Sequence, residues 1–229
     1  MVFQKQYWEN KKVLKRRHPS HPVIQAFAKP KVDLIIEQLN NDLYVNDNKN
    51  KMLLDVGAGN GYISYYLSQH FDVTCLDFSR NMLELCPLDK KILASAMHLP
   101  LKDKSFDVVF CSNLLHHLKD PLKALMEMSR VSSRYIIIVE PNRANPLMFL
   151  FSFVSKADKR LRKFSKKYFI SICEELAEHK IEFITTTGAV LPNITPSFLL
   201  PLMKIAEICL YPKLFHLLIL EKSTSSNKD

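Results

Sequence analysis

Three of the four glycines in this 229-residue chain, Gly57, Gly59 and Gly61, fall within five positions of one another. An average soluble protein spends roughly 7% of its residues on glycine, so a chain this sparing of glycine needs it here for a specific reason. The cluster follows an apolar run typical of a buried strand and precedes a segment with helical spacing. Glycine in such a turn lets a ligand approach the N–H groups at the start of the helix. A tight turn that binds nothing is the alternative.

Two carboxylates near this turn indicate what kind of ligand it suits. Asp55 stands two residues before Gly57, and Asp77 ends the next expected strand. A carboxylate at the mouth of the turn would repel a pyrophosphate and attract an ammonium group, while an acid at the end of the second strand can accept hydrogen bonds from both ribose hydroxyls. The glycine spacing is GxGxG, not the GxGxxG of dinucleotide sites. The pattern predicts a nucleoside with a positively charged appendage and no phosphate.

The elements that position these residues alternate between β-rich runs and helical segments over 51–140, which is typical of βα units around a parallel sheet. Strands are expected at 51–56, 71–77, 91–94, 105–112 and 134–140. Helices are expected at 61–70, at 79–86 with Ser79 as N-cap, and at 121–130 with Asp120 as N-cap. Outside this core we expect helix over 1–45 with breaks near Pro19, Pro22 and Pro30, a helix at 165–179, and strands at 181–187 and 214–221 separated by a mostly helical insertion.

The same stretch resembles the class I S-adenosylmethionine-dependent methyltransferases. The resemblance rests on LLDVGAGNG at 53–61, AMHLP at 96–100, DKSFDVV at 103–109, LHHLKDP at 115–121 and EPN at 140–142. It covers about residues 50–142, with a weaker echo in the last two strands. It implies an α/β fold, a Rossmann-like doubly wound sheet of seven strands in the order 3-2-1-4-5-7-6 with the last strand antiparallel, and with a helical N-terminal cover and helical insertions. It also implies S-adenosyl-L-methionine as cofactor and methyl transfer by in-line displacement.

Carried over position by position, the resemblance implies a set of cofactor-binding residues. The glycine turn would surround the methionine moiety, Gly61 would allow close helix packing, and Asp77 would bind the ribose. The other implied positions lie in the same turn, flank the adenine, or line the floor near the sulfonium: Asp55, Gly57, Ala58, Gly59, Phe78, Ser79, Met82, Ser95, Ala96, Met97, Ser112 and Asn113.

Ser95 departs from the family pattern. Members commonly carry an acid at this position, where it accepts a hydrogen bond from the adenine amino group. Serine can still accept that bond but without a charge, which predicts a loss of about 1–2 kcal/mol in adenine recognition. The sequence therefore predicts that the cofactor binds, and binds more weakly than in members with the acid.

His116, His117 and Glu140 are weak candidates for catalysis. Either histidine could act as general base for a hydroxyl acceptor, or both could simply pack the following helix. Glu140, at the end of a strand where open sheets bind ligands, could instead bond the N–H groups of the 141–145 turn. Tyr7 and Trp8 could form a lid over the cofactor or serve as a packing anchor. No metal is expected, because no His, Cys and acid cluster has ligand spacing.

The charge of the chain bears on its partners. Lys and Arg number 32 against 23 Asp and Glu, so this basic protein has a net charge of +9. The run KADKRLRKFSKK at 156–167 follows the apolar PLMFLFSFV at 146–154. A solvated basic face beside a buried helix is one interpretation. The other is peripheral contact with anionic membrane and a lipid-like acceptor, helped by residues 197–220; nucleic acid is less favoured because these charges have apolar neighbours.

A single methyltransferase domain is expected over 1–222, with a helical N-terminal cover at 1–45, a cofactor-binding core at 46–142, and a substrate-side elaboration with the last two strands at 143–222. Residues 223–229 are expected to form a flexible tail. Five cysteines without a CxxC pair indicate reduced core residues, and neither a spanning apolar run nor a secretory signal is seen. The sequence thus predicts a cytoplasmic protein, with a peripheral position at a membrane surface left open.

Three functions stay open at this level. The first is methyl transfer to an unidentified acceptor, small or lipid-like. The second is a non-catalytic S-adenosylmethionine-binding protein, which the departure at Ser95 allows. The third, less favoured by the glycine spacing and by Asp55, is a nicotinamide-dependent oxidoreductase. The acceptor atom and the oligomeric state do not follow from the sequence.

Overall fold

A computed structural model describes residues 16–43, 51–155, 158–209 and 211–223. The expected lid residues Tyr7 and Trp8 lie outside these ranges, as do the basic residues before position 16 and most of the expected tail.

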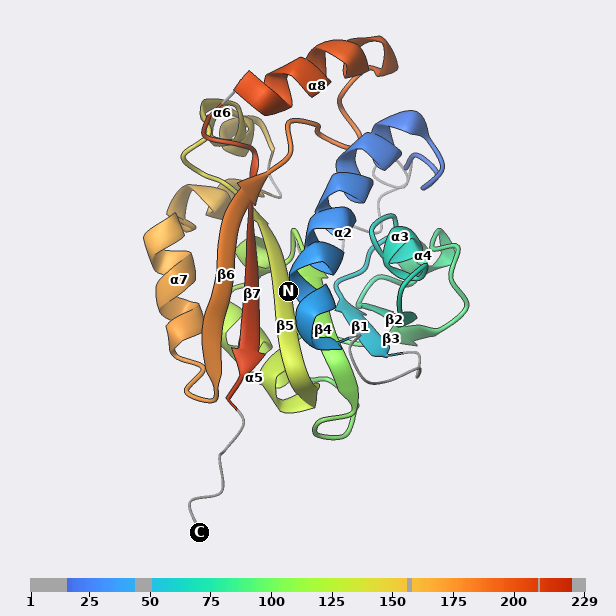
Figure 1. Cartoon of the computed structure of the whole chain (residues 1–229), viewed down its shortest axis with the longest axis vertical. Helices are drawn as coiled ribbons and strands as arrows, with labels where there is room; N and C mark the ends of the chain where they lie inside the picture. The colour runs from blue at the N-terminus through green and yellow to red at the C-terminus, as the bar shows by residue number, and fades with distance from the viewer. Residues whose placement is uncertain (1–15, 44–50, 156–157, 210, 224–229) are drawn as a thin grey trace.

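A seven-stranded sheet in the order β3-β2-β1-β4-β5-β7-β6 runs through the molecule (Figure 1). β7 is antiparallel to both of its neighbours, and the other strands run parallel to one another. The predicted strand order and antiparallel last strand are therefore confirmed. The strands are β1 (Met52–Val56), β2 (Asp72–Asp77), β3 (Lys91–Leu93), β4 (Phe106–Ser112), β5 (Ser132–Pro141), β6 (His179–Thr187) and β7 (Phe215–Lys222).

The strand register places the candidate binding residues at the carboxyl-terminal ends of the parallel strands. Asp55 pairs with Cys75 of β2 and with Phe110 of β4, so β1, β2 and β4 finish side by side. The central strands are buried on both faces, as their continuous apolar runs predict. Figure 1 shows α2 (Pro22–Leu43) in front of the sheet and α5 (Pro121–Val131) behind it.

The remaining helices connect the strands or extend past the sheet. They are α3 (Ser64–Leu67), α4 (Arg80–Glu84), η1 (Leu115–His117), α6 (Pro146–Val154), η2 (Asp158–Lys163), α7 (Lys166–Glu174), η3 (Ser197–Leu199) and α8 (Leu200–Cys209). The expected N-caps at Ser79 and Asp120 are confirmed, since their side chains accept hydrogen bonds from the N–H groups of Met82 and Lys123. No helix within the described ranges has the length and apolarity needed to cross a membrane.

Several helix boundaries predicted from the sequence differ from those in the structure. The break expected at Pro30 is wrong, because α2 continues through it. Its buried face includes Ile24, Phe27 and Ile35, and this packing offsets the hydrogen bond that proline cannot make. The helices expected at 61–70 and 165–179 are shorter than predicted: the glycine turn extends into the first, and β6 already begins at His179 after the second.

Candidate functional site

The glycine turn between β1 and α3 has a backbone that only glycine adopts easily. Gly57, Gly59 and Gly61 have φ values of 77°, 57° and 68°, in the left-handed region. A Cβ at Gly61 would lie 2.4 Å from the Cys86 sulfur, and one at Gly57 would lie 2.8 Å from Leu114. These glycines are therefore required both by the conformation of the turn and by the close approach of neighbouring segments.

Gly61→Ala is expected to lower the free energy of unfolding by more than the roughly 1–2 kcal/mol cost of placing an L-residue in the left-handed region. The added methyl group must also displace the Cys86 side chain. Denaturant unfolding of Gly61→Ala, Cys86→Ala and the double variant separates the two effects, because Cys86→Ala removes the sulfur and leaves the backbone strain. Additive losses in the double variant would contradict the predicted contact.

Asp77 holds the turn from the end of β2. Its two carboxylate oxygens accept hydrogen bonds from the N–H groups of Gly59 at 2.9 Å and Ser79 at 2.8 Å. Burial raises the pKa of Asp77, and these backbone N–H groups oppose that rise. Each oxygen retains a further lone pair, so the carboxylate can still accept from a ligand hydroxyl on each side.

Asp55 lies beneath the same turn and is buried. It accepts a hydrogen bond from the Ser64 hydroxyl. Burial raises the pKa of Asp55 to about 7, even though the Ser64 hydrogen bond lowers it. The carboxyl group is thus poised to lose its proton near neutral pH when a positive charge approaches.

A cavity of about 910 Å³ opens beside these two acids. Its wall includes every residue that the sequence assigned to cofactor binding except Gly61, which faces Cys86, and Ser79, which caps α4. Ser95 lines the cavity, where its hydroxyl accepts the Met97 N–H at 3.3 Å. Asn113, at the end of β4, has a positive φ of 53°, a conformation that asparagine tolerates better than most residues.

The other half of the cavity is lined by residues that the sequence did not single out. Apolar side chains there come from α6 and from the segment before η3, and charged ones from η2 and the start of the described chain. They include Arg16, Leu118, Met148, Phe151, Asp158, Arg160, Leu191 and Ile194. All of these except Leu118 belong to the N-terminal cover expected at 1–45 or to the substrate-side elaboration expected at 143–222.

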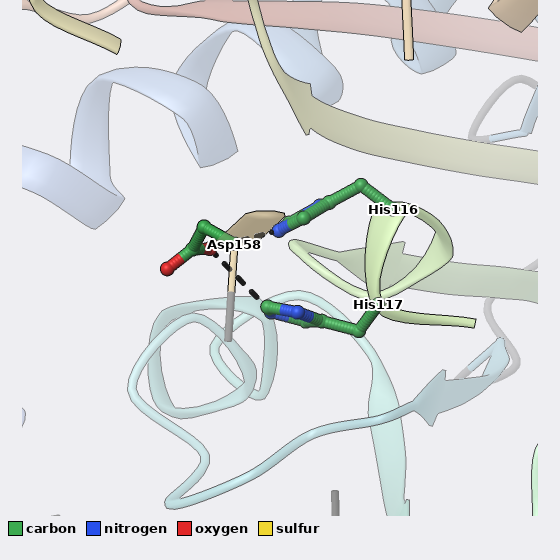
Figure 2. A group of neighbouring side chains, drawn as sticks. All are labelled: His116, His117 and Asp158. Carbon is green, nitrogen blue, oxygen red and sulfur yellow. Dashed lines mark hydrogen bonds and ion pairs between the residues drawn. The ribbon is translucent and has the colours of Figure 1, made fainter. Parts of the chain in front are cut away.

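His116 is buried between the carboxylates of Glu140 and Asp158. Figure 2 shows its contact with Asp158 and the neighbouring ring of His117. Its Nδ1 lies 2.6 Å from Glu140 Oε2, and its Nε2 lies 3.1 Å from Asp158 Oδ1. Burial lowers the pKa of His116, but the two carboxylates outweigh it and raise the pKa to about 9. His116 is thus an imidazolium at neutral pH and does not line the cavity. Of the two histidines, His117 is the one that lines the cavity.

Glu140 is fully buried and accepts the N–H groups of Leu114 and Leu115 at 2.8 Å each. The expected alternative, that it bonds the 141–145 turn, is wrong. That turn is closed by Asn142, whose side chain accepts the Ala144 N–H at 3.0 Å and whose carbonyl accepts the Asn145 N–H at 3.0 Å. The register of β4 against β5, which pairs Ser112 with Val139, places the turn after β4 over Glu140 instead.

Asp158 contacts His116 in this buried cluster and was not predicted as a site residue from the sequence. It stands 42 positions from His116 in a run that reads as basic, and its only signal was that it is the single acid there. The donor atoms of His116, His117 and Asp158 lie within 4.8 Å of one another, and such a set has the composition of a metal site. His116 Nε2 already faces Asp158, however, and its other nitrogen faces Glu140. The expectation that no metal is bound stays a prediction.

Comparison with known proteins agrees with this geometry. A family profile described as "Methyltransferase domain" matches residues 54–135. An uncharacterised protein of Methanocaldococcus jannaschii is 39% identical over 112 residues, 47% of this chain and 49% of that protein. A demethylmenaquinone methyltransferase of Staphylococcus haemolyticus is 38% identical over 114 residues, 45% of this chain and 48% of that protein. The chain thus spans about half the length of these curated relatives.

Solved structures share this fold. The magnesium protoporphyrin IX methyltransferase of Synechocystis, with S-adenosylhomocysteine bound, matches with a TM-score of 0.62 at 14% identity over 97% of this chain and 99% of that one. A SAM-dependent methyltransferase of Archaeoglobus fulgidus matches with a TM-score of 0.58 at 18% identity over 83% of this chain and 94% of that one. At these identities the likeness establishes the fold. Residues 54–135 are therefore a methyltransferase domain, carried on the fold of the class I S-adenosylmethionine-dependent methyltransferases.

Proposed function

We propose that this protein transfers a methyl group from S-adenosylmethionine to a small or lipid-like acceptor. The observation that carries the proposal is that one cavity holds both buried acids, Asp55 and Asp77, and a second, largely apolar part, which we call the acceptor half. In this assignment Asp77 accepts the ribose hydroxyls, Asp55 faces the ammonium group, and Ala96 and Met97 flank the adenine. Asn113 lies near the reacting centre.

Methyl transfer from S-adenosylmethionine depends more on positioning of the acceptor than on a catalytic side chain. S-adenosylmethionine, when bound, supplies an activated methyl on a sulfonium. The chain holds the acceptor in line with it and keeps water out. For a hydroxyl acceptor, His117 is the candidate base. Arg160 donates a hydrogen bond of 2.6 Å to the backbone carbonyl of His117. Asp158 Oδ1 lies 3.8 Å from His117 Nε2, where the carboxylate would stabilise the positive charge that a transferred proton brings.

The apolar wall supports an acceptor with an apolar body. Leu118, Met148, Phe151 and Ile194 line this half of the cavity. Relatives include demethylmenaquinone methyltransferases, tRNA U34 carboxymethyltransferases and a porphyrin methyltransferase, so family membership alone leaves the acceptor open. A wall of this kind suits a quinone-like or lipid-like molecule better than a polynucleotide.

Incubation of the protein with methyl-labelled S-adenosylmethionine and fractionated cell extract tests the proposal. We expect label in the organic-soluble fraction. Label only in RNA or protein would overturn the assigned acceptor class. Cofactor binding without transfer to any fraction would favour the non-catalytic alternative, and calorimetric binding of NADH instead of S-adenosylhomocysteine would favour the oxidoreductase.

The raised pKa of Asp55 predicts that cofactor binding releases a proton. Near pH 7 the free carboxyl group is partly protonated, and an ammonium group beside it favours the charged form. Affinity for S-adenosylhomocysteine should therefore rise with pH through about 7. Calorimetry in two buffers of different ionisation enthalpy measures the released proton. Asp55→Asn should abolish the release, whereas Asp72→Asn, at the exposed start of β2, should leave it intact.

A further inference from the structure

Helix α6 is apolar on the side that faces water as well as on the side that faces the protein. Met148 points inward and is buried, and Phe151 lines the acceptor half of the cavity. On the opposite side Leu150 is 64% exposed and Val154 is 84% exposed. A surface helix ordinarily carries polar residues on its outer face, so an outer face of leucine and valine indicates that something apolar covers it.

A second apolar surface lies at the same end of the molecule. Phe198 of η3 is 79% exposed, and Leu202 and Ile205 of α8 are also exposed. Figure 1 shows α6 and α8 beyond the end of the sheet where the parallel strands finish. The two are tied together, because the N-cap of α6, Asn145, donates a hydrogen bond of 2.6 Å to the carbonyl of Pro212 just after α8. We refer to the exposed faces of α6, η3 and α8 as the apolar platform.

Positive charge borders the platform. The guanidinium of Arg162 lies 4.8 Å from the ring centre of Phe153 on α6, and Lys163, Lys166 and Lys167 are exposed nearby. The one acid among residues 158–168, Asp158, is turned inward to His116. Exposed apolar side chains with a basic border are the combination that binds the interface of an anionic bilayer.

The platform also adjoins the acceptor half of the cavity. Ile194, three residues before the start of η3, and Phe151, on α6, both line that cavity. A bilayer against the platform would therefore lie next to the acceptor half of the cavity. We propose that the apolar platform docks this protein on anionic membrane, so that a lipid-like acceptor passes from the bilayer into the cavity. The choice of acceptor source rests on the proposed function, while the docking itself does not.

Cosedimentation with vesicles tests the docking. The wild-type chain should sediment with vesicles of phosphatidylcholine and phosphatidylglycerol, and at least tenfold less with phosphatidylcholine alone, with binding that falls as salt is raised. Leu150→Glu/Val154→Glu should lower the partition onto anionic vesicles at least tenfold. Met126→Glu is the matched control, since Met126 is 52% exposed on α5, away from the platform, and should bind like the wild type.

Two outcomes would overturn the docking proposal: equal partition of the wild-type chain onto both kinds of vesicle, and wild-type binding by Leu150→Glu/Val154→Glu. A concentration-dependent dimer that the same double variant abolishes, without vesicle binding, would assign the platform to a second copy of the chain instead. Binding of S-adenosylhomocysteine is measured in parallel and should be equal in all variants. If the wild-type chain fails to bind it, the proposed function fails while the docking result stands.

Discussion

Replacing Asp77 by alanine is expected to weaken S-adenosylhomocysteine binding at least about a hundredfold. A hydrogen bond to a charged group contributes about 1.5–3 kcal/mol, and two from the ribose hydroxyls therefore correspond to two or more factors of ten. The substitution also removes the acceptor for the N–H groups of Gly59 and Ser79. Loss of the shape of the glycine turn would add to the loss of ribose contacts.

Calorimetry on a short series separates these effects. Asp77→Asn keeps one acceptor oxygen and should fall between alanine and the wild type. Asp72→Ala removes an exposed acid from the start of the same strand, where it pairs with Lys90 at 2.6 Å, and should bind as the wild type does. Affinity within threefold of the wild type for Asp77→Ala, in a protein that melts normally, would remove Asp77 from the cofactor site.

The parts of the fold that follow from local pattern were predictable. Residues 136–139 in β5 are four consecutive apolar residues and are fully buried, because a strand covered on both faces has no polar side to present. The glycine turn was found for a similar reason, since positive φ and close packing both act on the residue itself. Asp55 and Asp77 were then predicted as binding residues because each lies near the carboxyl-terminal end of a strand.

The parts that depend on distant contacts were not predictable from one sequence. Nothing near Pro30 shows that α2 continues through it, because the stabilising contacts come from segments far along the chain. Asp158 reads as one acid in a basic run until η2 packs against η1 and brings it to His116. The identity of the N–H groups that Glu140 accepts depends likewise on the register of β4 against β5.

Glu140→Gln is expected to lower the free energy of unfolding by about 3–5 kcal/mol, the usual result of removing one partner from a buried ion pair. The imidazolium of His116 would lose its partner at 2.6 Å and keep only Asp158, which is partly exposed. Glutamine retains one oxygen for the N–H groups of Leu114 and Leu115, so the turn after β4 should survive. Denaturant unfolding at pH 6 measures the loss.

The same substitution should flatten the dependence of stability on pH above neutrality. The pKa of His116 is raised from an ordinary value of 6.5 to about 9, so its contribution is fully present below pH 6.5 and is lost as the pH rises through 9. At about 1.36 kcal/mol per pKa unit this contribution is about 3 kcal/mol. The pKa of Asp158, by contrast, is lowered to about 2. Burial acts to raise this pKa, but the hydrogen bond from His116 and the charges of both histidines outweigh burial and lower it. The contribution of Asp158 is therefore lost only as the pH falls through 2.

The change in unfolding free energy from pH 6 to pH 9.5 is compared between the wild type and Glu140→Gln. Asp55, whose pKa is raised to about 7, titrates in both proteins, so the difference between them isolates the His116 contribution. The wild type should lose stability between the two pH values, and Glu140→Gln should lose much less. Glu178→Gln, which removes an exposed carboxylate paired with Lys222, should keep the wild-type difference. Combining Glu140→Gln with His116→Asn should cost less than the sum of the single substitutions, because the double variant leaves no unpaired imidazolium. Strict additivity, or a wild-type pH difference in Glu140→Gln, would show that Glu140 does not hold the charge on His116.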